Sequence, residues 1–310
     1  MSNNTAIAVL MSTYNGEKFI KEQINSILSQ KDVDVCLYIR DDGSSDSTIE
    51  IINDYCRNNK NVRLINKPDE KNVGVLRSFL TLLKYVLNEN TEFNYFCFAD
   101  QDDYWKPEKI SKALQMLSRV EDVNEPSLYY SNKTFVNGLL DDPRDENIIY
   151  YGDFYEGFYG SLAYGCTMVF NRSLAILTAS HIPTIKCMHD SWMYRIAKSV
   201  HANIFFDKNS YILYRQHENN VVGEDACKPS KYRWSNIIKK REHYIQSFYQ
   251  EIYDCYNDYI FGDEKKYIEL ILSYNKSIKS MYELAFDKQA KKRGKKSFIL
   301  WIAKLVFRTL

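Results

Sequence analysis

The sequence contains few of the residues that build flexible connections. Glycine and proline account for 11 and 6 of its 310 residues, which argues against long disordered linkers. No apolar run approaches the roughly 18 residues that a membrane-spanning helix needs, and residues 1–16 lack the basic stretch and apolar core of a signal peptide. We therefore expect a folded, cytoplasmic protein with one large domain and an appendage.

Three further absences bear on function. The formal net charge is only +1, so no global field attracts nucleic acid, and we expect no nucleic-acid partner. The seven cysteines include no Cys-x-x-Cys pair, which is typical of a reducing compartment rather than of a disulfide framework. Neither G-x-G-x-x-G nor G-x-x-x-x-G-K-[ST] occurs, so a glycine-rich loop would not hold the phosphates of a bound nucleotide.

Apolar strand-like runs alternate with helical periodicity over the first part of the chain. Strands are predicted at 6–12, 33–39, 61–67 and 93–100, and the helices between and after them begin near Phe19, Ser47, Val75 and Lys106. This alternation is typical of an α/β fold with βαβ units on a mostly parallel sheet. Ligands bind beyond the carboxyl ends of such strands. Residues 12–14, 40–42 and 100–103 are therefore the predicted site.

The alternation ends near residue 125. Further strands are predicted at 127–132, 203–207 and 211–217, and helical periodicity dominates from residue 228 onward. We place a domain boundary near residue 225. It separates a first domain over 1–225 from a C-terminal helical region over 226–310.

Three carboxylates end the run YFCFADQDDYW. Asp100 and Asp102 directly follow a buried strand, where a divalent cation could bridge them to a diphosphate. Without a cation, two close carboxylates repel each other and one pKa rises. The alternative is a solvated turn that caps the next helix, and we expect Asp103 to have that capping role.

Two other motifs carry a candidate acidic residue. A polar turn accounts for the other polar residues of IRDDGSSDST but not for Asp41 and Asp42. A carboxylate at this place can accept a hydrogen bond from a pyrimidine N3–H or a ribose hydroxyl. Asp190 in MHDSWM either caps a helix beginning at Ser191 or acts as a general base, with His189 beside it.

The motif YRQHENNVVG carries two basic side chains on one strand face. Arg215 and His217 are two residues apart near a strand end, so they point the same way. That pair suits a diphosphate or a metal ion. A solvated strand edge is the alternative.

In this order the motifs resemble family 2 of the inverting glycosyltransferases, which have the GT-A fold. The resemblance covers residues 5–225 and rests on the stretches MSTYNGEKFIKEQINSILSQ, IRDDGSSDST, NVGVLRSF, ADQDDYWKPEK, HDSWM and YRQHENNVVG. Within the family the sequence is most similar to bacterial rhamnosyltransferases that build capsular or cell-wall rhamnose polysaccharides. The resemblance implies a Rossmann-like, mostly parallel sheet flanked by helices.

The resemblance also implies roles for individual residues. Ser12, Tyr14, Asp42 and Asp100 would bind the nucleotide, Asp102 and His217 would hold Mg²⁺ or Mn²⁺, and Asp190 would be the catalytic base. Arg215, His189 and Trp192 would contact the diphosphate or the acceptor. One departure concerns the acceptor side, since Ser191 stands before Trp192 where some relatives have an aromatic residue directly after the His-Asp pair.

The implied reaction is transfer of L-rhamnose from dTDP-L-rhamnose to a polysaccharide or lipid-linked acceptor. Another donor, such as UDP-galactose or UDP-GlcNAc, is an alternative within the same class. A nucleotidyltransferase would need a basic loop after the first strand, where STYNGEKF offers only Lys18. A non-catalytic carbohydrate-binding protein would lack the metal or base residues, which are both present.

The last segment of the chain is basic and then apolar. Six basic residues, Lys288, Lys291, Lys292, Arg293, Lys295 and Lys296, precede a potential helix whose apolar face would carry Phe298, Trp301, Ile302, Leu305 and Val306. This tail would either lie in a membrane interface, as a lipid-linked acceptor favours, or pack on the helical region or on a second subunit. We therefore expect a peripheral location on the inner face of the cell membrane, or a homodimer through the C-terminal helices.

Overall fold

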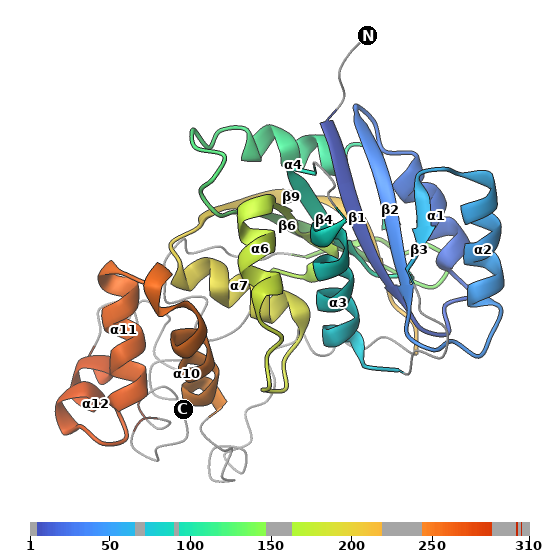
Figure 1. Ribbon diagram of the computed structural model, residues 1–310. Coiled ribbons are helices and arrows are strands. Elements are labelled where there is room, and N and C mark those ends of the chain that lie inside the picture. Colours follow the sequence, from blue (N-terminus) through green and yellow to red (C-terminus); the bar gives the residue numbers. More distant parts are fainter. Residues whose placement is uncertain are drawn as a thin grey trace.

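One nine-stranded sheet forms the centre of the protein, and the computed structural model in Figure 1 shows helices on both of its faces. The strand order is β3-β2-β1-β4-β8-β6-β9-β5, and β7 pairs with β6. The structure describes residues 5–65, 72–89, 93–146, 163–218 and 244–286, together with Ile302 and Leu305.

The first half of the chain builds the parallel part of the sheet. Its elements are β1 (Thr5–Thr13), α1 (Ile20–Leu28), β2 (Val33–Asp41), α2 (Thr48–Asn58), β3 (Val62–Leu64), α3 (Val75–Asn88) and β4 (Tyr95–Ala99). Strands β3, β2, β1 and β4 are all parallel. Strand β1 is apolar on both faces because Ala8 and Leu10 enter one core, whereas Ile7 and Val9 enter the other. The predicted α/β fold with βαβ units is confirmed.

The second half of the chain adds a mixed extension to the sheet. It contains β5 (Tyr104–Trp105), α4 (Lys109–Leu117), β6 (Ser127–Val136), β7 (Arg144–Asp145), the 3₁₀ turn η1 (Gly165–Thr167), β8 (Val169–Asn171), α6 (Arg172–Ser180), α7 (His189–Ser199) and β9 (Asn203–Arg215). Strand β8 is antiparallel to β4 and β6, whereas β9 is parallel to β6.

The two strands predicted at 203–207 and 211–217 form one continuous strand, β9. The polar residues 207–210 interrupted the apolar pattern and suggested a turn. In the structure this stretch pairs with β6 where the register shifts between Ser131 and Thr134. Such an irregularity lets a polar segment pass without ending the strand.

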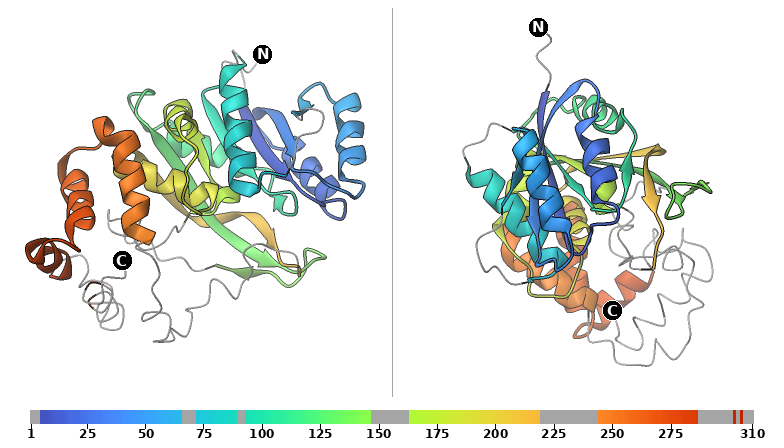
Figure 2. Two further views of the ribbon diagram at one scale, coloured as in Figure 1. Left: turned by 60° about the horizontal axis from the view of Figure 1, so that its bottom comes forward. Right: turned by 90° about the vertical axis from the view of Figure 1, so that its right-hand side faces the viewer.

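The C-terminal helices pack at one end of the molecule, against α6 and α7 (Figures 1 and 2). They are α10 (Tyr244–Tyr256), α11 (Gly262–Ser273) and α12 (Ile278–Ala285), with the 3₁₀ turn η2 (Asn257–Tyr259) between α10 and α11. Their buried side chains belong to the same hydrophobic cluster as those of α3, α6 and α7. The predicted boundary near residue 225 lies outside the described residues and stays a prediction.

Two positions of the C-terminal tail are described. Leu305 is fully buried in the cluster that the C-terminal helices share, and Ile302 packs against it. At these positions the tail packs on the protein, which was one of the two alternatives. None of the helices in the described part of the chain has the length and apolar character to span a membrane.

Candidate active site

A cavity of about 960 Å³ lies at the carboxyl ends of β1, β2 and β4. The start of α3, η1, the first turn of α7 and the segment after β9 complete its wall. Eight residues that the sequence indicated line it together: Ser12, Tyr14, Asp42, Asp100, Asp102, His189, Asp190 and His217. Arg215 and Trp192 are not part of the lining.

Asp42 lies in the wall that β2 contributes. Its buried carboxylate accepts hydrogen bonds from the Arg40 guanidinium at 2.6 Å and from the backbone N–H groups of Val73 and Gly74 at 2.9 and 2.8 Å. A carboxylate has about four acceptor positions, so one on Asp42 is left for a ligand. Asp42 also fixes the start of α3 against the end of β2.

The end of β1 supplies Ser12 and Tyr14. The Ser12 hydroxyl is hydrogen-bonded to the Ser78 hydroxyl at 2.6 Å. The backbone N–H and C=O of Tyr14 are held by the side-chain amide of Gln101 at 2.9 and 3.0 Å. The Tyr14 side chain is 51% exposed at the cavity, so its ring is available to stack on a planar ligand.

Asp102 and His217 form the pair that the sequence marked for a metal ion. Asp102 Oδ2 lies 2.8 Å from His217 Nε2, and both side chains are mostly buried. The Phe19 ring packs on the imidazole with 5.0 Å between centroids, which limits its rotation. Carboxylate oxygen and imidazole nitrogen are both common ligands of divalent metals. The two side chains are close enough to bind one cation.

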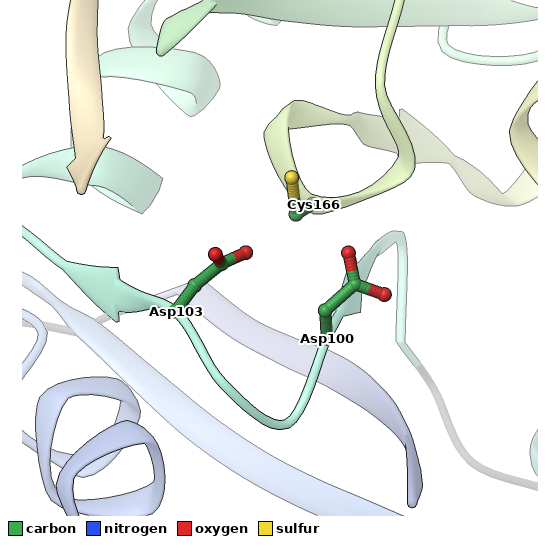
Figure 3. Close-up of side chains that lie close together, drawn as sticks. All are labelled: Asp100, Asp103 and Cys166. Atoms are coloured by element: carbon green, nitrogen blue, oxygen red, sulfur yellow. The ribbon is translucent and has the colours of Figure 1, made fainter. Parts of the chain in front are cut away.

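The neighbouring carboxylates converge on a thiol, as Figure 3 shows. One potential ligand atom from each of Asp100, Asp103 and Cys166 lies within 4.8 Å of the others. Burial, together with the charges of Asp102 and Asp190, raises the pKa of Asp100 to about 7. Burial also raises the pKa of the Cys166 thiol well above its usual value. A protonated thiol is a poor ligand, so this cluster suits Mg²⁺ or Mn²⁺ less well than the Asp102–His217 pair does.

The prediction that Asp103 caps the following helix is wrong. Helix α4 begins at Lys109 and its N-cap is Glu108. Asp103 is fully buried, and its Oδ1 accepts the backbone N–H of Arg215 at 3.2 Å. Burial, followed by the charges of Asp102 and Asp100, raises the pKa of Asp103 well above its usual value.

Arg215 lies behind the acidic turn rather than in the cavity. It is 1% exposed, and Nε donates to the Asp102 carbonyl oxygen at 2.8 Å. Its other nitrogens donate to the Gly138 carbonyl oxygen and to the Glu22 carboxylate, each at 2.5 Å. Arg215 therefore does not line the cavity in which we expected it to contact a diphosphate. The geometry makes Arg215 a residue that positions Asp102.

Asp190 lies in the first turn of α7. The N-cap of this helix is Met188, so the alternative in which Asp190 caps a helix from Ser191 is wrong. Asp190 Oδ2 accepts the backbone N–H of Gly165 at 3.1 Å. A carboxylate is also favoured by the partial positive charge at a helix N-terminus. Asp190 is thus oriented by η1 and α7 while it lines the cavity.

His189 is a buried neighbour of Asp190, not an open side chain at the mouth of the site. Its ring stacks on Phe79 at 4.0 Å between centroids and meets Phe98 edge-on at 4.8 Å. Burial lowers the pKa of His189 to about 4, so the ring is neutral at pH 7. A Cβ on Gly165 would lie 2.3 Å from His189 Nε2. The approach of η1 to α7 therefore requires glycine at position 165.

Trp192 lies in the core of the protein rather than in the wall of the cavity. It is fully buried, and its ring centroid lies 5.5 Å from that of Phe248 and 6.2 Å from that of Tyr256, both on α10. Trp192 joins α7 to the C-terminal helices. The sequence alone could not separate the two positions, because a large aromatic beside a candidate base suits a sugar site and a core equally well.

A carboxylate of α10 holds the segment that leads to Asp190. Glu251 accepts hydrogen bonds from His181 Nε2 and the Thr184 N–H, each at 2.7 Å, and from the Ile185 N–H at 3.3 Å. Burial alone would raise the pKa of Glu251, but these hydrogen bonds outweigh it and lower the pKa. The C-terminal region thus positions residues 181–185 before α7.

Several residues that shape the site were not predicted. Gln23 is fully buried on α1 and donates to the Asp100 carbonyl oxygen at 2.8 Å. Its position within an otherwise apolar helix face was a signal, because a buried amide needs a partner. Gln101 lies within the predicted stretch 100–103, but no role of its own was predicted for it. Gly165 and Glu251 carried no comparable signal.

Comparison with known proteins identifies the class. Residues 8–176 match the family described as glycosyl transferase family 2. A dTDP-rhamnosyl transferase of Shigella flexneri, RfbG, is 32% identical over 242 residues, which cover 74% of this chain and 80% of the relative. A glucosyltransferase of Escherichia coli, named UDP-Glc:alpha-D-GlcNAc-diphosphoundecaprenol beta-1,3-glucosyltransferase WfaP, is 25% identical over 75% of this chain and 85% of its own length.

The fold is likewise that of known glycosyltransferases. The structure of S. aureus TarS residues 1–349 in complex with UDP-GlcNAc is similar with a TM-score of 0.59 and 17% identity, over 99% of this chain and 82% of that one. The expected GT-A fold is confirmed. The chain belongs to glycosyl transferase family 2 and is a glycosyltransferase.

Proposed function

We propose that the protein transfers L-rhamnose from dTDP-L-rhamnose to a saccharide acceptor with inversion at the anomeric carbon. The observation that carries the donor assignment is the 32% identity to a dTDP-rhamnosyl transferase over most of both chains. The cavity supports this assignment, because it is lined by Asp42 as a candidate partner of the pyrimidine, by the candidate metal ligands Asp102 and His217, and by the Asp190 carboxylate.

In this proposal Asp190 is the general base. It removes the proton of the acceptor hydroxyl as that oxygen attacks the anomeric carbon from the face opposite the diphosphate. A β-linked donor would therefore yield an α-L-rhamnoside. Gly165 and the first turn of α7 orient the carboxylate for this step.

The donor would lie along the opposite wall. Asp42 keeps an acceptor position for a pyrimidine N3–H, and the exposed ring of Tyr14 offers a stacking surface for the base. Asp102 and His217 would hold Mg²⁺ or Mn²⁺, a placement favoured by the neighbouring carboxylates of Asp100 and Asp190 in the cavity wall. Once bound, such a cation would stabilise the charge on the diphosphate leaving group as a Lewis acid.

A UDP-sugar donor is the second candidate. Two similar proteins favour it: the E. coli relative is named for UDP-Glc, and the TarS complex contains UDP-GlcNAc. The name of the same E. coli relative also includes a diphosphoundecaprenol-linked sugar, which supports a lipid-linked acceptor. Such an acceptor would place the protein at the inner face of the membrane. The pairing of two chains through the C-terminal helices, which the sequence also suggested, stays a proposal.

A panel of donors tests this assignment. The full chain is incubated with Mg²⁺ and with dTDP-L-rhamnose, UDP-glucose, UDP-galactose or UDP-GlcNAc, and release of the nucleoside diphosphate is measured. We expect kcat/KM for dTDP-L-rhamnose to exceed the others by at least about tenfold, the scale on which small differences in a substrate group are discriminated. If kcat/KM is higher for any UDP-sugar than for dTDP-L-rhamnose, the donor assignment is wrong.

Substitution of Gly165 tests whether η1 orients the proposed base. In Gly165→Ala the added Cβ would meet the His189 ring at 2.3 Å, so either η1 or α7 must shift. We expect kcat to fall about 10- to 100-fold, because a misplacement of about 1 Å can cost that much. Donor affinity should stay unchanged.

The matched control is Gly138→Ala. Nothing lies within 4 Å of a Cβ at that position, so activity and melting temperature should be preserved. An unchanged kcat for Gly165→Ala would show that the hydrogen bond to Asp190 has no orienting role.

A further inference from the structure

Helix α12 carries an exposed apolar face that the fold does not explain. Ile278, Tyr282 and Phe286 are four residues apart and therefore on one side of the helix. Their side chains are 80%, 62% and 50% exposed. The Tyr282 and Phe286 rings pack on each other with 4.5 Å between centroids, so they form one surface. We call Ile278, Tyr282 and Phe286 the outer face of α12.

The orientation of α12 is fixed by its opposite side. Ser280, Leu284 and Ala285 are buried, and Met281 packs on the same hydrophobic cluster as α10 and α11. Rotating the helix to cover the outer face would expose these residues. Figures 1 and 2 place α12 at the extremity of the molecule, at the end opposite α1 and α2.

The outer face adjoins a strongly basic part of the chain. Lys276 and Lys279 are exposed beside it, and Lys279 only weakly pairs with Glu283 at 3.9 Å. The sequence that follows, residues 287–310, contains eight basic residues and one acidic residue, Asp287. An apolar surface flanked by two exposed lysines and followed in the sequence by a basic segment complements a membrane with anionic lipids.

We propose that the outer face of α12 is the surface by which the protein binds an anionic membrane. Tyr and Phe rings favour the boundary between headgroups and acyl chains. The neighbouring lysines and the basic segment supply the electrostatic attraction to anionic headgroups. A second copy of this chain is a less suitable partner, because pairing two such faces would bring two basic segments together.

This proposal reassigns the role of the tail. The sequence left Ile302 and Leu305 either on a membrane-binding face or packed on protein, and the structure packs both of them on the protein. The apolar contact with lipid thus comes from α12, and the following basic residues contribute charge. The proposal does not depend on the donor sugar or on the identity of Asp190 as the base.

Vesicle co-sedimentation of the full chain tests the proposal. The vesicles are phosphatidylcholine alone or phosphatidylcholine with phosphatidylglycerol. The test variant is Ile278→Ser with Tyr282→Ser, and the matched control is Val123→Ser with Leu139→Ser, which removes two apolar side chains that are 73% and 81% exposed elsewhere. We expect the test variant to bind anionic vesicles at least about tenfold more weakly and the control to bind normally.

Further measurements make the outcome decisive. Binding of the unaltered chain should require phosphatidylglycerol and weaken at high salt. Circular dichroism and release of nucleoside diphosphate with a water-soluble acceptor should be the same for both variants and the unaltered chain. The proposal would be overturned if the test variant bound anionic vesicles as tightly as the unaltered chain. It would also be overturned if the unaltered chain bound both kinds of vesicle equally well. A dimer in sedimentation velocity that only the test variant dissociates would assign the face to a second copy instead.

Discussion

Asp190→Asn is expected to abolish most of the sugar transfer while leaving donor binding intact. The amide keeps the size of the side chain and can still accept the Gly165 N–H through its oxygen, but it cannot take up the acceptor proton. Loss of a general base typically costs about 100- to 10,000-fold in rate. The measurement is kcat for transfer, together with calorimetric titration of the nucleoside diphosphate.

The control for this variant is Asp54→Asn. Asp54 is exposed on α2 and pairs with Arg57 at the surface, so its loss should leave transfer unchanged. If Asp190→Asn retains the turnover of the unaltered protein, another group must take the proton. If it loses donor affinity as well, Asp190 has a binding role that the proposal does not include.

Asp102→Ala is expected to remove the dependence of nucleotide binding on a divalent cation. Residues that only orient a metal ligand commonly contribute about 10- to 100-fold to metal affinity, so loss of a proposed ligand should weaken Mn²⁺-dependent dTDP binding by at least about 100-fold. His217→Ala should weaken binding in the same direction, because its Nε2 lies 2.8 Å from Asp102 Oδ2.

The readout is a titration of dTDP with Mn²⁺ and with a chelator present. For the unaltered chain the two curves should differ widely, whereas for Asp102→Ala they should coincide at the weaker affinity. Identical metal-dependent curves for the unaltered chain and Asp102→Ala would exclude Asp102 as a ligand. In that case the cluster of Asp100, Asp103 and Cys166 would become the next candidate.

The sequence predicted the parallel half of the fold well because its signals there are local. Continuous apolar runs such as residues 6–12 mark strands buried on both faces, and each is followed by a helix with one apolar side. The βαβ connectivity then brings the strand ends together, so the amino-acid pattern alone could assign residues 12, 42, 100 and 102 to one site.

The prediction was weaker where side-chain partners lie far apart in the sequence. Asp103 and Arg215 are 112 positions apart and are joined by the Arg215 N–H, so an acidic residue just before a helix was mistaken for its cap. The resemblance placed Trp192 at the diphosphate or the acceptor, whereas in the structure it packs on Phe248 and Tyr256 of α10, a contact that no local pattern indicates.

Asp41 illustrates the same limit within a single turn. The sequence could not explain why two aspartates follow each other at the end of β2. In the structure Asp41 accepts the Thr13 hydroxyl at 2.8 Å and the backbone N–H groups of Gly43 and Ser44 at 3.0 and 2.7 Å. Asp41 thus closes the turn, which leaves Asp42 to face the cavity.

The hydrogen bonds between Glu251 and residues 181–185 determine where the chain can be truncated without disturbing the site. A fragment ending near residue 225 would keep every described residue that lines the cavity. It would lack the carboxylate that fixes the approach to Asp190, and it would open the fully buried Trp192 to solvent. The family motifs are confined to the first part of the chain, but the helices behind them are structurally part of the same enzyme. We therefore expect the smallest active fragment to extend past residue 225.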